Sequence, residues 1–538
     1  LRPEMIAVRK LIALRRHTLV SRCFVACLLS WYGCESAPAP TLVSSEFNVV
    51  ETTINDIHDA MASGQITAQV LVETYLTRIA TYDKQGPALN AIITINPNAL
   101  KVAEELDAAY TQSGLTGPLH GIPIIVKDNY DTFDLPITAG SLSLTTSVPP
   151  DDAFQIRKIR EAGGIILAKS NMAEFAFSPY ETVGSALAGY TRNPYAPNRV
   201  TAGSSGGTAA AVAANFGTVG LGTDTGNSIR GPSSHQNLVG IRSTMGLTSR
   251  DGIVPLNLAR DIGGPMARTV TDAVIVFDVL AGPDPNDPVT QVSHEYRAAN
   301  YTDYLNVDGL DGTRIGVLRE LSDETADDEI IARFNEALAS MRRLGATIVD
   351  PINLPQDETT ISDDRPRCNR FRFDLNAYLE TLGPQAPVKS LADILESDRL
   401  HPTIRQRLES AEAITIPPNQ QPGCHLQADR DERLRLRIQT VLTDGDLDAL
   451  VYPTWDNPPR LIGDLNSPHG NNSFQLSPPT GFPAITVPMG SVGMELPSGL
   501  QFLGTAWSEP KLIAIAYAFE QGTQHRIAPP IVPVVQRK

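Results

Sequence analysis

The chain has 538 residues, with 60 Asp or Glu against 44 Lys or Arg, which gives a formal net charge of −16. A surface with this balance repels polyphosphate and argues against nucleic-acid binding as the main role. Hydrophobic residues make up 42% of the chain, which is typical of a globular protein and excludes a disordered or collagen-like one. The five cysteines are too few for a disulfide scaffold.

The first 47 residues have the features of a leader followed by a linker. Basic residues up to Arg22 precede a short apolar stretch at residues 23–32, an order typical of a secretory signal. A Gly-Cys pair ending at Cys34 is similar to a bacterial lipoprotein cleavage site, in which Cys34 would carry the lipid. Plain secretion, with cleavage near Ala37 or Ala39, is the alternative. We therefore expect an exported protein that is periplasmic, secreted or tethered to a membrane through Cys34.

Residues 48–530 are expected to form a single domain, because short apolar runs alternate there with segments of helical periodicity. This alternation favours an α/β layered sheet. Pro123 is unusual for a central strand. The elements expected in the first third are a helix capped by Thr67, a strand at 91–95, a helix at 98–110, a strand at 122–126, a helix at 152–162 and a strand at 165–168.

The stretch at residues 357–432 differs from its surroundings, because it is rich in Arg, Asp and Pro and has helical pieces at 374–382 and 392–396. We expect an inserted helical segment over the main sheet. Its Cys368 and Cys424 could pair in an oxidising compartment, or they could be two unrelated buried thiols. Strands are then expected at 449–452, 484–487 and 500–503, followed by a helix at 509–520 and a tail at 531–538.

Two turns rich in Gly and Ser, at residues 203–207 and 225–228, flank an Ala-rich helical run and a short Gly-rich strand. Each turn places a serine at or near the start of a helix. Backbone N–H groups are unpaired at such a position, and the positive end of the helix dipole favours negative charge. The block is therefore suited to stabilising an oxyanion.

Three serines compete for the role of nucleophile, namely Ser204, Ser205 and Ser228. Ser205 is central in a formal G-x-S-x-G motif, but two prolines and no apolar run precede it, which argues against a nucleophile elbow. Ser228 is the better candidate, because consecutive amides surround its hydroxyl and Gly226 lets a substrate carbonyl approach the backbone. The alternative is that Ser228 only caps the following helix.

A nucleophilic serine needs a base. Lys127 follows an apolar strand, where loss of hydration would lower its pKa and leave a neutral amine that accepts a proton. The alternative for Lys127 is a solvated charge. His120 and His235 are the nearest histidines to these motifs, and neither has a carboxylate partner that can be recognised from the sequence.

Together these residues resemble the amidase signature family, a group of serine hydrolases that cleave amide bonds. The resemblance covers residues 49–530 and implies an α/β amidase fold, with a large mixed β-sheet core between helices on both faces. The matching motifs are at residues 120–129, 169–175, 193–195, 203–207, 224–230, 264–270, 480–484 and 496–502.

The resemblance also implies the roles of individual residues. Ser228 would be the nucleophile, Ser204 the bridge and Lys127 the base of a Ser-Ser-Lys triad, with a cis peptide between Gly203 and Ser204. No metal or organic cofactor is called for. The oxyanion hole would be formed by the amides of Thr225, Gly226, Asn227 and Ser228, and the supporting residues would be Ser205, Asp224 and Arg230.

The sequence departs from the family at Ala202 and Asn227, where the family commonly has glycine. Asn227 could narrow the pocket or contact the substrate. The expected reaction is hydrolysis of a carboxamide C–N bond through an acyl-enzyme, releasing ammonia or an amine from a small amide or a peptide's C-terminal amide. The alternatives are a glutamine-hydrolysing amidotransferase subunit that supplies ammonia to a tRNA-dependent partner, and a non-catalytic binding protein on the same scaffold.

Overall fold

The structure, a computed structural model, describes residues 47–178, 183–322, 326–355, 367–464, 466, 470–493 and 495–534. The expected leader up to residue 46, with Cys34, lies outside the described residues, as does the end of the expected tail. The described chain from Phe47 onward belongs to one compact unit.

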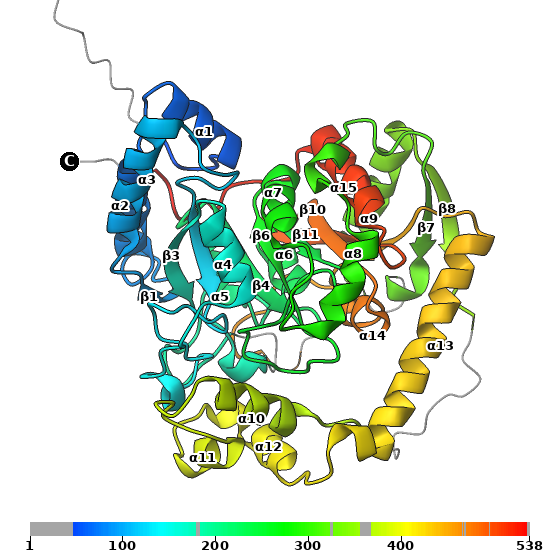
Figure 1. Cartoon of the computed structure of the whole chain (residues 1–538). Coiled ribbons are helices and arrows are strands. Elements are labelled where there is room, and N and C mark those ends of the chain that lie inside the picture. The colour runs from blue at the N-terminus through cyan, green and yellow to red at the C-terminus, as the bar shows by residue number, and fades with distance from the viewer. Residues whose placement is uncertain are drawn as a thin grey trace, which may run out of the picture. The chain divides into compact units, whose positions relative to one another are not determined.

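A mixed sheet of eleven strands forms the centre of this unit (Figure 1). The strand order is β1-β3-β2-β4-β6-β5-β10-β11-β9-β7-β8, so two sets of parallel strands are joined by antiparallel ones. The strands are β1 (Ile92–Ile95), β2 (Pro123–Lys127), β3 (Ile165–Ser170), β4 (Val219–Asp224), β5 (Val239–Arg242), β6 (Ile262–Ala267), β7 (Arg314–Leu318), β8 (Thr347–Ile352), β9 (Ala449–Pro453), β10 (Ala484–Val492) and β11 (Leu496–Leu503).

The central strand β2 is buried along its whole length and pairs in parallel with both β3 and β4. Pro123 is tolerated because it is the first residue of β2, and its carbonyl still accepts a hydrogen bond from the backbone N–H of Thr218 (3.0 Å). Carboxyl ends of neighbouring parallel strands meet at one edge of a sheet, which is where open α/β sheets bind ligands. Lys127 ends β2 and Asp224 ends β4, so the fold brings both to this edge.

Helices cover both faces of the sheet, as the resemblance implies. Neighbouring residues of β6 show the two faces, because Gly263 faces Gln155 of the helix α4 (Phe154–Glu161) whereas Gly264 faces Ile229 at the start of the helix α6 (Arg230–His235). The helices are α1 (Ile54–Ala62), α2 (Ala68–Tyr82), α3 (Ala99–Ser113), α4 (Phe154–Glu161), α5 (Gly206–Ala213), α6 (Arg230–His235), α7 (Val270–Leu280), α8 (Ser293–Tyr296), α9 (Asp328–Arg343), α10 (Phe371–Thr381), α11 (Leu391–Glu396), α12 (Pro402–Glu412), α13 (Pro422–Asp444), α14 (Ser477–Thr480) and α15 (Glu509–Thr523).

Local sequence signals account for several of these elements. Thr67 caps α2 as predicted, since its side chain accepts a hydrogen bond from the backbone N–H of Val70. Ser508 is the N-cap residue of α15, but its side chain makes no capping bond. Among the described residues, no helix combines the length and the apolar content that a membrane crossing requires.

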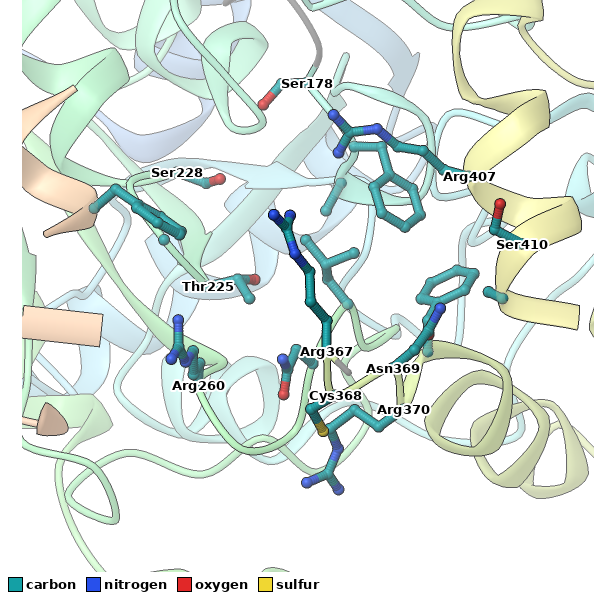
Figure 2. A pocket seen from close by; sticks show the side chains of 18 of the residues that line it. Ser178, Thr225, Ser228, Arg260, Arg367, Cys368, Asn369, Arg370, Arg407 and Ser410 are labelled. Carbon is teal, nitrogen blue, oxygen red and sulfur yellow. The ribbon is translucent and has the colours of Figure 1, made fainter. Parts of the chain in front are cut away.

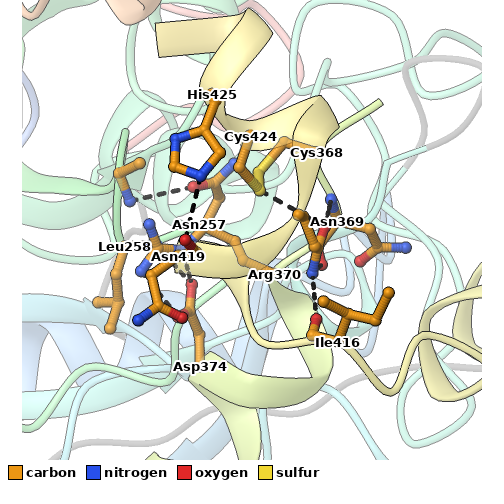
Figure 3. Close-up of a disulfide and its surroundings, with 12 residues drawn as sticks. Asn257, Leu258, Cys368, Asn369, Arg370, Asp374, Ile416, Asn419, Cys424 and His425 are labelled. Carbon is orange, nitrogen blue, oxygen red and sulfur yellow. Dashed lines mark hydrogen bonds and ion pairs between the residues drawn. A yellow bond between two sulfur atoms is a disulfide. The ribbon is translucent and has the colours of Figure 1, made fainter. Parts of the chain in front are cut away.

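The helices α10, α11 and α12 pack against one another and form a second hydrophobic core with loops that follow β2 and β3. A disulfide between Cys368 and Cys424 joins the segment before α10 to the first turn of α13 (Figure 3). The pairing that the sequence left open is therefore made. Next to it, Asp374 of α10 pairs with Arg370 and accepts a hydrogen bond from the backbone N–H of Leu258 (2.9 Å), which ties this segment to the main domain.

Candidate active site

Lys127 lies at the carboxyl end of β2 with 0% of its side chain exposed. Its Nζ is 2.7 Å from Ser204 Oγ and 2.6 Å from Thr223 Oγ1. Burial lowers the pKa of Lys127 from 10.5 to about 7, and the carboxylates of Asp261 and Asp224 only partly oppose the shift. The alternative of a solvated lysine is therefore wrong, and a substantial fraction of this amine is neutral near pH 7.

Ser204 is held in place by its backbone. The peptide bond between Gly203 and Ser204 is cis, as the resemblance implies, and the Ser204 carbonyl accepts a hydrogen bond from the backbone N–H of Ala173 (3.2 Å). The Ser204 side chain is 0% exposed. The Asn227 side chain donates a hydrogen bond from Nδ2 to the Gly203 carbonyl (3.1 Å). Asn227 thus joins the turn that carries Ser228 to the turn that carries Ser204.

The turn at residues 225–228 lies between the end of β4 and the start of α6. Within the described part of the chain, none of its four backbone N–H groups donates a hydrogen bond. Four consecutive unpaired donors are a suitable environment for a developing oxyanion. Ser228 is 4% exposed, and α6 begins with Ile229 as its N-cap and without a side-chain cap bond. The capping role considered for Ser228 is therefore wrong.

A buried ion-pair network supports this turn. Asp224 is paired with Arg230 and Arg242 at 3.1 Å each, and it accepts a hydrogen bond from the backbone N–H of Ile229 (3.2 Å). Burial would raise the pKa of Asp224, but the two guanidinium groups outweigh it and hold the pKa at about 2. Arg230 also donates to the Gly226 carbonyl (2.9 Å), so the network fixes both ends of the turn.

The same turn borders a cavity of about 680 Å³ (Figure 2). Thr225, Gly226, Asn227 and Ser228 form one wall, and the opposite wall comes from residues 367–371 and from α12. Phe474 covers the backbone at Gly226. A volume of this size accommodates a small peptide or drug-sized molecule. Ser228 is therefore placed where it can reach a bound substrate.

The structure gives the other candidate nucleophile and the two candidate histidine bases different roles or positions. Ser205 has no strand before it, and its hydroxyl donates to the backbone carbonyl of Thr223 (3.2 Å), which is a supporting contact. His120 precedes β2, at the strand end opposite Lys127, and its ring contacts Thr116 (2.8 Å). The ring of His235 packs on Trp455. Among the described residues, no group of three or more His, Cys, Asp or Glu could hold a metal ion.

The sequence analysis did not identify two neighbours of the site, Thr223 and Arg242. Thr223 contacts the Lys127 amine and also accepts a hydrogen bond from Asn129 Nδ2 (3.1 Å). Asn129 is the last residue of the motif at residues 120–129 that contains Lys127. No sequence motif assigns a role to Thr223, which is known only as a residue of β4. Arg242 ends β5, 18 residues after Asp224, and β6 lies between their two strands in the sheet, so only the folded sheet brings the two side chains together.

The chain is similar to known proteins in sequence and in fold. A family model for amidases matches residues 70–513. A protein described as a probable amidase of Arabidopsis thaliana is 35% identical over 509 residues, covering 91% of this chain and 93% of the relative. A glutamyl-tRNA(Gln) amidotransferase subunit from Thermoanaerobacter pseudethanolicus is 31% identical, covering 89% of this chain and 97% of the relative. The crystal structure of a peptide amidase from Stenotrophomonas maltophilia is similar with a TM-score of 0.80 and 36% identity, covering 89% of this chain and 99% of that one.

Proposed function

The chain belongs to the amidase signature family and is an amide-hydrolysing enzyme, and we propose that it removes the C-terminal amide of short peptides through a Ser-Ser-Lys triad. The observation that carries the triad is the 2.7 Å contact between Lys127 Nζ and Ser204 Oγ, both of them fully buried. The likeness to a peptide amidase supports the choice of substrate.

The proposed first half-reaction transfers protons along this contact. Ser228 Oγ attacks the amide carbon and passes its proton to Ser204, whose own proton moves to the neutral amine of Lys127. The backbone N–H groups of residues 225–228 stabilise the negative oxygen of the tetrahedral intermediate. The proton then returns from Lys127 through Ser204 to the leaving nitrogen, the C–N bond breaks, and ammonia leaves an ester on Ser228.

Water completes the cycle by the same route. The neutral Lys127 again accepts a proton through Ser204 as water attacks the ester, and Ser228 recovers its proton when the carboxylic acid leaves. A neutral amine has two N–H donors and one lone pair, so Lys127 can accept from Ser204 while it donates to Thr223. Burial is essential to this role because it lowers the pKa of Lys127 and so favours the neutral amine. A protonated lysine has no lone pair that could accept a proton.

The test is ammonia release from a panel of peptide amides, fatty amides, aryl amides and glutamine by the purified chain. We expect turnover of peptide amides by the wild type, and none by a folded Ser228→Ala variant. The matched control is Ser205→Ala, which retains measurable turnover because this hydroxyl supports the turn and does not react. If glutamine were the only substrate hydrolysed, and only when a partner protein is added, the result would instead favour the amidotransferase function suggested by the other relatives.

We further propose that the chain is exported. The disulfide between Cys368 and Cys424 supports this, because such bonds persist mainly in oxidising compartments. Fractionation of cells that express the whole chain should place it outside the cytoplasm, and Cys34→Ala should release it from the membrane fraction if Cys34 carries a lipid. Recovery of the protein in the cytoplasm with both cysteines reduced would contradict export.

A further inference from the structure

The cavity beside Ser228 gathers positive charge on a protein that is acidic as a whole. Four of its lining residues are arginines, and none of the described lining residues is Asp or Glu. The chain as a whole carries a formal net charge of −16. A cleft lined by one sign of charge raises the local concentration of molecules of the opposite sign. The four arginines are Arg260, Arg367, Arg370 and Arg407.

Two of these cations have carboxylate partners. Arg260 pairs with Asp431 of α13 (2.7 Å), and Arg370 pairs with Asp374 of α10 (2.6 Å). The Asp374 carboxylate is nearly buried, so this pair is shielded from solvent. Both arginines therefore hold helices of the cavity wall in place, and each leaves little net charge for a ligand.

Arg407 differs from them. It lies on α12 with its guanidinium over the ring of Phe177, 5.8 Å from the ring centroid, and no carboxylate among the described residues pairs with it. Arg405, two residues earlier on the same helix, pairs with Asp398 and Glu409. In Figure 2 the Arg407 side chain extends from α12 along the upper edge of the cavity and the Arg367 side chain extends upward from below, and both guanidinium groups point toward the side that carries Ser228.

A cation–π contact with an aromatic ring uses none of the N–H donors of a guanidinium group. The Phe177 ring contacts the Arg407 guanidinium through its face, and the N–H donors of that group can form paired hydrogen bonds with a carboxylate. When ammonia is the leaving group, every other part of the substrate belongs to the acyl half. A negative group that reaches Arg407 must therefore be on the acyl half.

We propose that Arg407 is a specificity-determining residue that binds a carboxylate on the acyl half of the substrate, so that the enzyme prefers peptide amides with an acidic side chain. This inference rests on the proposed function, because it takes Ser228 as the point where the scissile amide binds. The contact is made equally in the ground state and in the transition state, so it lowers KM and leaves kcat nearly unchanged.

The experiment compares three peptide amides that differ only in one side chain: acetyl-Glu-Leu-NH2, acetyl-Gln-Leu-NH2 and acetyl-Lys-Leu-NH2. We expect kcat/KM from ammonia release to be about tenfold higher for the Glu amide than for the Gln amide, the size of one charge-assisted hydrogen-bond pair. The Lys amide should be the poorest substrate. High salt should reduce the ratio of Glu to Gln, because part of the cavity is open to solvent.

Three variants assign the preference to one side chain. Arg407→Gln should bring the ratio of Glu to Gln close to one, mainly through a higher KM for the Glu amide. Arg407→Lys keeps the charge and should retain part of the ratio. Arg405→Gln is the matched control on the same helix and should leave the ratio at the wild-type value, because its guanidinium already pairs with Asp398 and Glu409.

The outcomes separate the two proposals. A wild-type enzyme that hydrolyses none of the three amides contradicts the proposed function. Turnover of all three with a wild-type ratio of Glu to Gln near one overturns the inference and leaves the function standing. A wild-type preference that persists in Arg407→Gln also overturns it, because another group must then bind the carboxylate. The wild-type ratio is measured without any substitution, so the proposal can fail even if a variant does not fold.

Discussion

The burial of Lys127 makes the stability of the protein depend on pH in a way that one substitution removes. Its pKa is lowered by burial from 10.5, the value expected in the unfolded chain, to about 7 in the folded protein. Between these values the unfolded chain holds a proton that the folded protein lacks. The free energy of unfolding therefore rises with pH in this window, and the dependence ends below it, where both states are protonated.

Lys127→Met keeps an unbranched side chain that is one heavy atom shorter and removes its charge. The lost contacts with Ser204 and Thr223 shift the stability of the variant by a nearly constant amount. The pH-dependent part is about 1.4 kcal/mol for each pH unit, so the difference in unfolding free energy (variant minus wild type) should fall by roughly 2 kcal/mol between about pH 8 and about pH 9.5.

Urea unfolding followed by the fluorescence of the three tryptophans measures this difference at each pH. Other titrating groups are shared by the two proteins and cancel from the comparison. Arg405→Gln is the control, and its stability should run parallel to that of the wild type. Parallel curves for Lys127→Met and the wild type would refute the reasoning, because they would mean that Lys127 keeps its proton in the folded protein.

Three further predictions concern activity and stability. The pH profile of kcat/KM should rise up to tenfold per pH unit below about pH 7 and level off above it, because only the neutral Lys127 amine accepts a proton; a limb that instead falls with pH would exclude this base. Asn227→Gly removes the hydrogen bond to the Gly203 carbonyl, so steady-state kinetics should show about a tenfold lower kcat, and an unchanged kcat would show that the two turns align without it. Cys424→Ser removes a disulfide that spans 56 residues; the unfolding free energy should fall by about 4 kcal/mol, and equal stability with and without reductant would contradict the constraint.

Local patterns in the sequence were sufficient to predict much of the sheet and its helices. The strand that ends at Lys127, the cap at Thr67 and the helix over residues 98–110 correspond to β2, α2 and α3. These elements have clear apolar runs or capping residues, so local chemistry determines them. The cis peptide before Ser204, which the structure contains, was expected only from the resemblance to a known family and not from local chemistry.

Strands without an apolar pattern could not be predicted in this way. The strand β6 has the sequence IGGPMA and pairs with both β4 and β5, yet its glycines and proline resemble a turn. It is a strand because both faces are buried and the backbone of β4 completes its hydrogen bonds. Such a tertiary effect leaves no trace in a short stretch of sequence.

The far side of the cavity was unpredictable for a related reason. Arg407 and Phe177 are separated by more than two hundred residues and meet only because α12 packs beside the loop after β3. The sequence indicated a helical segment there but gave no means of choosing which of its many arginines face the substrate. Contacts of this kind depend on the three-dimensional arrangement of segments that have no shared motif.

The central claim is that Ser228 forms a covalent acyl intermediate, and mass spectrometry of the enzyme after rapid acid quench of a peptide amide reaction tests it most directly. Trypsin leaves Ser204, Ser205 and Ser228 on one fragment, residues 200–230, so fragmentation of that peptide locates the added acyl mass. We predict that the mass is on Ser228 alone and is absent from the Lys127→Met variant. An acyl group on Ser204 or Ser205, or continued turnover by Ser228→Ala, would contradict the account.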